Sequence, residues 1–168
     1  MLITVICGVM MMAGLFLMLL SGVGFIQDKR FFGSAPKEVR DAVPESKPER
    51  FKGQHAVGWI MAAVSVLLLV AAPILGAADG IQNDLTFLQL FIRFNVMWLM
   101  MKAFDIIFFD WVLLCNAGFN FFPHFYPETK AVLGHHLFGY NWKTHAVHFI
   151  GGAAAAALLG WICVMIAG

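Results

Sequence analysis

Histidine and aspartate side chains near the ends of apolar segments are the residues of this sequence that could do chemistry. His145 and His148 begin the last apolar segment, and Asp105 and Asp110 lie in the segment before it. An imidazole and a carboxylate can act as general acid and base near neutral pH, and both bind borderline divalent ions. We therefore predict catalytic roles for Asp105, Asp110 and His148. Alternatively, His145, His148 and Asp110 are candidate ligands of a divalent metal such as zinc.

The metal interpretation rests on residue types and not on a signature. An HxxH pair offers two imidazoles on one helix face, but the sequence contains no HExxH motif. Haem held by His55 and His148, which begin different apolar segments, is a less favoured alternative. In a third interpretation the histidines are structural and anchor their segments at the membrane interface by hydrogen bonds.

Polar side chains also lie inside the third apolar segment, where charges are costly in a membrane. On a helical wheel at about 100° per residue, four of them fall within roughly 80° of one another. They are Asn95, Lys102, Asp105 and Asn116. On a continuous α-helix Asp110 would lie roughly 140° from Asp105, so the two aspartates would not share a face. The stripe predicts either a lined site or pathway, or a Lys102–Asp105 pair with asparagines bonding between helices.

Composition decides the fold class. The chain has 168 residues, of which 61% are hydrophobic and 12% charged, whereas a soluble domain is closer to half apolar. The excess lies in four long segments, and we predict an all-α integral membrane four-helix bundle that forms a single domain over 1–168. The net charge of +1 gives no case for nucleic acid binding. The expected spans are 2–26, 56–78, 85–116 and 144–167.

The charge distribution predicts the orientation of the bundle. The connections 27–55 and 117–143 carry nine lysines and arginines, and the N-terminus, the 79–84 turn and the C-terminus carry none. The positive-inside rule then places both long connections in the cytoplasm and both termini outside. Because nothing basic precedes the first apolar run, we expect an uncleaved span and not a signal peptide.

The two long connections differ in character. The first contains Ser34 followed by APKEVRDAV, which predicts a short amphipathic helix with Ser34 as its cap and Pro36 in its first turn. The second is rich in phenylalanine, tyrosine and tryptophan and lacks a clean helical period. We expect it to lie in the membrane interface or to fold against the mouth of the bundle.

The last span carries a ridge of small residues at a spacing of four, formed by Gly152, Ala156 and Gly160. Such a ridge lets two helices approach closely. It is a candidate surface for a homo-oligomer. If the ridge instead packs inward, His145 and His148 point into the bundle, because they lie within roughly 60° of it on the wheel.

Three stretches resemble a group of small bacterial four-span membrane proteins that has no assigned activity. They are FDIIFFDW at 104–111, PET at 127–129 and HAVHFIGG at 145–152. The resemblance covers the chain from Phe104 onward. It implies the four-span plan and a bacterial cytoplasmic membrane, and its motif positions are Asp105, Asp110, Glu128 and His148.

Three functions follow as hypotheses. The first is a membrane enzyme or metal-binding protein whose polar site, at the cytoplasmic interface, takes a lipid-like or quinone-like substrate beneath the aromatic connection. The second is a transporter or channel made by oligomerisation, with the polar stripe lining its route. The third is a structural or accessory subunit of a membrane complex, in which the polar residues are interhelical pairs.

Overall fold

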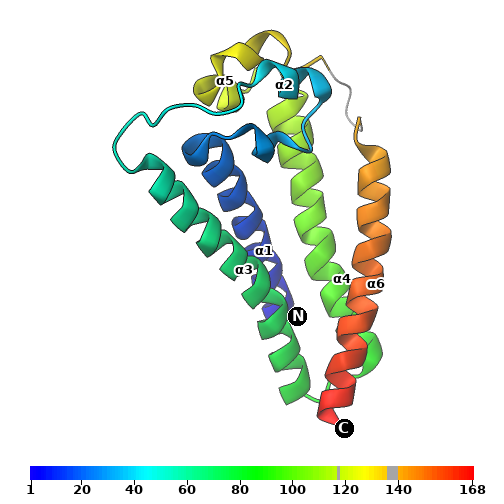
Figure 1. Ribbon diagram of the computed structural model, residues 1–168. Helices are drawn as coiled ribbons and strands as arrows, with labels where there is room; N and C mark the ends of the chain where they lie inside the picture. Colours follow the sequence, from blue (N-terminus) through cyan, green and yellow to red (C-terminus); the bar gives the residue numbers. More distant parts are fainter. Residues whose placement is uncertain (117, 136–139) are drawn as a thin grey trace. The chain divides into compact units, whose positions relative to one another are not determined.

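The computed structural model describes residues 1–116, 118–135 and 140–168, and it contains helices and no named strand over that part of the chain (Figure 1). The all-α fold class is therefore confirmed. Residues 117 and 136–139 of the predicted aromatic connection lie outside the described residues. The chain divides into two compact units, and the single domain over 1–168 stays a prediction. Unit 1 comprises Met1–Gly14, Leu67–Ala103 and Asn141–Gly168, and unit 2 comprises Leu15–Val66 and Phe104–Tyr140.

Three helices are long and apolar enough to cross a membrane, in line with three of the four predicted spans. The first runs over Leu2–Ile26 and combines α1 (Leu2–Leu19) with a π-helical turn, η1 (Leu20–Ile26). The second is α3 (Gln54–Gln82), which extends past both predicted ends. The third is α6 (Trp142–Ala167).

The remaining predicted span changes its winding part-way. It consists of α4 (Phe87–Phe104) followed by the π-helix η3 (Asp105–Leu114). The backbone N–H of Cys115 donates to the carbonyl of Asp110 at 2.9 Å, which is the i→i+5 bond of this winding. Because each residue of a π-helix turns the chain by a smaller angle than a residue of an α-helix, this winding brings Asp110 nearer to the face of Asp105 than an α-helix would. The expectation that they would not share a face was made for a continuous α-helix, and it does not apply to this winding.

In unit 1 the small-residue ridge of α6 packs against α4 of the same chain. Gly152, Ala156 and Gly160 are all buried. A Cβ built on Gly160 would lie 3.4 Å from the backbone nitrogen of Phe91. Helix α4 therefore covers the ridge within the chain. The homo-oligomer predicted through this ridge stays a prediction.

In unit 2 the two long connections fold together around a shared apolar core. Over their described residues the connections contain the short helices η2 (Lys29–Phe32), α2 (Lys37–Ala42), α5 (Phe121–Phe125) and η4 (Pro127–Ala131). The core consists of Val23, Phe32, Val39, Val43, Leu113, Leu114, Phe122, Tyr126 and Leu133. The aromatic connection therefore buries rings against the first connection.

The predicted short helix is present, but its predicted cap is wrong. Helix α2 begins at Lys37 with Pro36 at the capping position and no side-chain cap. The carbonyl of Ser34 instead accepts a hydrogen bond from the Tyr140 hydroxyl at 3.2 Å. A cap at Ser34 would require helical backbone from residue 35, and the helix starts two residues later.

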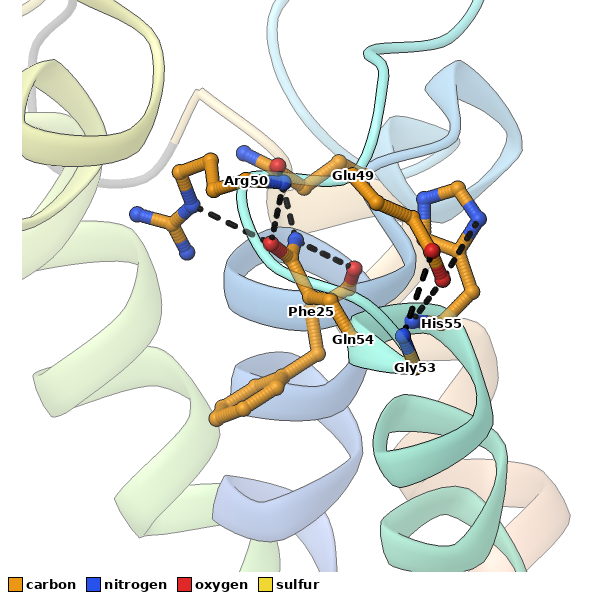
Figure 2. Close-up of polar contacts among 7 residues, drawn as sticks. Phe25, Glu49, Arg50, Gly53, Gln54 and His55 are labelled. Atoms are coloured by element: carbon orange, nitrogen blue, oxygen red, sulfur yellow. Dashed lines mark hydrogen bonds and ion pairs between the residues drawn. The ribbon is translucent and has the colours of Figure 1, made fainter.

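The start of α3 is held by a polar network within unit 2 (Figure 2). The Glu49 carboxylate accepts hydrogen bonds from the backbone N–H groups of His55 at 2.8 Å and Gly53 at 3.3 Å. The Gln54 side chain donates to the carbonyl of Phe25 at 2.8 Å, and Arg50 donates to the carbonyl of Gly24 at 2.7 Å. These bonds satisfy orphan donors at the helix start and fasten it to the end of η1.

Candidate functional site

In unit 1 a lysine of α4 and a histidine of α6 meet. The Lys102 Nζ atom lies 3.4 Å from Nδ1 of His148. Lys102 is only 4% exposed, whereas His148 lies on the exposed surface of its helix. A buried ammonium group therefore stands behind an accessible imidazole. The sequence predicted that Lys102 pairs with Asp105 on its own segment. The structure shows a contact between Lys102 and His148 on another helix.

One glycine sets the geometry of this contact. The Trp98 indole Nε1–H donates to the carbonyl of His148 at 3.1 Å, which ties α4 to α6. Gly152 lies one turn further along α6, and a Cβ at this position would collide with the Trp98 indole. Only glycine lets the indole reach the His148 carbonyl here. Gly152, the first residue of the predicted ridge, therefore packs directly against the Trp98 ring.

The residues of the predicted polar stripe have contacts in both units, and the stripe as a lining surface stays a prediction. The Asn95 amide donates to the carbonyl of Phe91, one turn back on its own helix, at 3.0 Å. The Asn116 side chain accepts a hydrogen bond from the backbone N–H of Gly118 at 2.9 Å. Asp105 is half-buried at the first position of η3, in unit 2. Asn95 and Asn116 thus serve their own segments, whereas Lys102 joins a second helix in unit 1.

In unit 2, Asp110 lies beside Tyr140. Asp110 is 7% exposed, and the Tyr140 hydroxyl approaches its Oδ1 atom at 3.4 Å while donating to the Ser34 carbonyl at 3.2 Å. Burial, followed by the negative charge of Asp110, raises the pKa of Tyr140 well above its usual range. The phenol therefore stays protonated and serves as a donor that joins the two long connections.

The predicted metal ligands belong to different units. His145, which is 7% exposed, and His148 lie in unit 1, whereas Asp110 lies in unit 2. Within residues 1–116, 118–135 and 140–168, no three side chains of histidine, cysteine, aspartate or glutamate gather as a metal-binding group. The zinc and haem hypotheses stay predictions, and the described geometry adds no ligand set to them.

A second polar site in unit 1 was not predicted. The Arg93 Nη1 atom pairs with Oδ2 of Asp79 at 2.6 Å and donates to the carbonyl of Gly76 at 2.7 Å. Arg93 is 7% exposed. On a helical wheel Arg93 lies nearly opposite the predicted polar stripe, so the sequence pattern assigns it no role. The signal that could have found this pair is an arginine early in one span and an aspartate late in the preceding one, across a short turn.

Comparisons with protein-family models, with curated proteins and with solved structures found no match for this chain. The likeness of its FDIIFFDW, PET and HAVHFIGG stretches to small four-span membrane proteins therefore stays a resemblance. A function has to be argued from the contacts within the chain.

Proposed function

We propose that the chain is an integral membrane protein that crosses the bilayer four times, with both long connections in the cytoplasm and both termini outside. Three of the crossings are the helices that are long and apolar enough to span. The fourth is the continuous helical stretch α4–η3, from Phe87 to Leu114. The bacterial cytoplasmic membrane, which the resemblance implies, belongs to the same proposal.

The contact between the two long connections supports the fourth crossing. The Lys47 Nζ atom lies 2.8 Å from Oε1 of Glu128, and the rings of Phe32 and Tyr126 meet edge to face with centroids 4.9 Å apart. Two segments in contact lie on the same side of a bilayer. The chain leaves that side through α3, so it must cross again through α4–η3 before it reaches Glu128.

At the cytoplasmic ends of α4 and α6, we assign to Lys102 and His148 a site for the polar head of a lipid-like or quinone-like molecule. The observation that carries this assignment is the 3.4 Å contact of Nζ with Nδ1. A lysine donating to Nδ1 leaves the imidazole proton on Nε2, from which it can donate to a carbonyl or phosphate oxygen. The accessible face of His148 lets a molecule dissolved in the bilayer approach from the side.

The same contact favours an oxygen-bearing head over a metal ion at His148. An ammonium charge 3.4 Å from Nδ1 repels a divalent cation at that imidazole, and the repulsion is strong where water is scarce. For an electron-rich oxygen the same charge is attractive. The transporter and accessory-subunit hypotheses remain alternatives. The side chains of Asn95 and Asn116 form hydrogen bonds within their own segments, which gives no support to a lined pathway.

A binding measurement tests this site. The protein in uncharged lipid nanodiscs would be titrated with decylubiquinone, a short-chain quinone, and separately with short-chain phosphatidic acid. We expect His148→Ala and Lys102→Met each to weaken binding of one of these probes about tenfold, the effect of losing one charge-assisted hydrogen bond. Lys143→Met, an exposed lysine at the start of the same helix, is the matched control. Equal affinities in all four proteins would rule out the site.

A further inference from the structure

Unit 1 contains a pair of adjoining hollows where α3 turns into α4. Their volumes are about 530 and 260 Å³, and Arg93, Leu85 and Met1 line both. The larger one lies within the roughly 300–1,000 Å³ range of small-molecule sites. Neither hollow includes Lys102 or His148, so this site is separate from the one proposed above.

The smaller hollow has mainly apolar walls, whereas the larger one is mixed and is also lined by Asp79 and Asn83. Leu2, Ile6 and Ile92 supply aliphatic surface, and Thr4 and Gln89 supply a hydroxyl and an amide. Leu2 is 76% exposed and Ile92 48% exposed, so the aliphatic wall continues onto the outer surface of the helices. A molecule with an acyl chain could therefore lie half inside a hollow and half along that surface.

Arg93 lines both hollows, and its printed protein contacts all involve one guanidinium nitrogen, Nη1. Its Nη1 donors are used by the Gly76 carbonyl and the Asp79 carboxylate. Within the part of the chain that the structure describes, no hydrogen bond from Nε or Nη2 to a protein group is found, and neither atom is among the fully buried side-chain nitrogens without a partner. These two neighbouring N–H donors match the two oxygens of a carboxylate or phosphate.

Asp79 has a positioning role in this arrangement. Its Oδ2 atom holds Nη1 at 2.6 Å, and its side chain is 34% exposed. An arginine at this depth is costly in an apolar bundle unless it is paired. Pairing through Nη1 fixes the plane of the guanidinium group. Nε and Nη2 are therefore ordered before a ligand binds.

We infer that the hollows bind the oxyanion head of a single-chain amphiphile, a carboxylate or a phosphate, through Nε and Nη2 of Arg93. The aliphatic wall of Leu2, Ile6 and Ile92 takes the first part of the acyl chain. The inference goes beyond the proposed function and uses no residue of the Lys102–His148 site. A free carboxylate or phosphate would share the head chemistry, but it would make no use of the aliphatic wall.

The test is equilibrium dialysis of radiolabelled laurate against the full chain in phosphatidylcholine nanodiscs, with empty nanodiscs subtracted. We expect saturable binding with one laurate per chain. Dodecyl phosphate should compete with laurate. The uncharged dodecanol should compete at least tenfold less well, because it offers the Nε and Nη2 donors of Arg93 neither a second oxygen nor a negative charge. Acetate and inorganic phosphate should also compete poorly. Competition by these small anions as strong as that by dodecyl phosphate would overturn the amphiphile and indicate a free anion.

Variants separate the ion pair from the hollow. Arg93→Lys keeps the charge but loses the fork, and we expect laurate affinity to fall about tenfold. Since that change could also disturb folding, a second variant, Leu85→Trp, places a larger side chain at a residue that lines both hollows and keeps Arg93 and Asp79. It should also weaken laurate binding, because it narrows the hollows. Arg40→Gln, which removes an arginine charge outside the hollows, should bind like the parent chain. Unchanged binding in both Arg93→Lys and Leu85→Trp would overturn the inference, as would no saturable binding above empty nanodiscs. Unchanged laurate binding in His148→Ala would show that the two sites are independent.

Discussion

At the residue scale, the pairing of Lys102 with His148 depends on which side chains are small as much as on which are charged. The helical wheel placed Lys102 on a polar face and His148 near the ridge of α6, so both residues could be selected from the sequence. Their contact could not be foreseen, because a wheel gives the face of one helix and not its neighbour on another. The Arg93–Asp79 pair was missed for the same reason: its two halves lie on consecutive helices.

Gly152 gives a direct test of this packing. We expect Gly152→Ala to destabilise the protein by about 1–3 kcal/mol, because the new methyl group would push the Trp98 indole from the His148 carbonyl. A Cβ added at the neighbouring Gly151 would meet nothing within 4 Å, so Gly151→Ala should be neutral or should stabilise the helix by up to about 1 kcal/mol. Thermal unfolding of both variants in mild detergent checks this. Equal losses of stability in the two variants would contradict the close approach of Trp98.

At the element scale, apolar composition predicted the positions of the long helices well, but it could not predict their winding. Helix η3 keeps the hydrophobic character of a span and changes to i→i+5 hydrogen bonds at Asp105. No residue type between Phe104 and Leu114 announces that change, because π-winding depends on how the surrounding segments pack. The angle between Asp105 and Asp110 expected for a continuous α-helix therefore does not apply, although both residues were identified.

The start of α3 provides a prediction at this scale. Hydrogen bonds from the backbone of His55 and then Gly53 lower the pKa of Glu49. The carboxylate therefore supports the helix start at pH values above the ordinary glutamate value of 4.5, and this support is lost as the pH falls below it. We expect Glu49→Ala to speed hydrogen exchange of the amides in the first turn of α3 several-fold at neutral pH. Glu45→Ala, whose side chain is 88% exposed, should leave those amides unchanged, and similar exchange in both variants would show that Glu49 is not a cap.

At the scale of the whole molecule, the sequence predicted the all-α class and a membrane location from composition alone. It did not predict that the two long connections share a core. Each connection looks polar or irregular by itself, and the apolar residues that join them, such as Val39 and Tyr126, are far apart in the chain. Their packing makes the two connections one compact structure. That packing is the observation that supports placing both connections on the same side of the membrane.

The number of crossings is the central claim, and labelling of single cysteines from the two sides of the membrane tests it most directly. In a background with Cys7, Cys115 and Cys163 replaced by alanine, Lys37→Cys, Lys130→Cys and Asn83→Cys would be treated in intact cells with a membrane-impermeant maleimide. All three positions are exposed. With four crossings, the cysteine at 83 reacts from outside, and the cysteines at 37 and 130 react only after the cells are opened. If the cysteines at 37 and 130 react from opposite sides, α4–η3 does not cross the bilayer and the proposed topology is wrong.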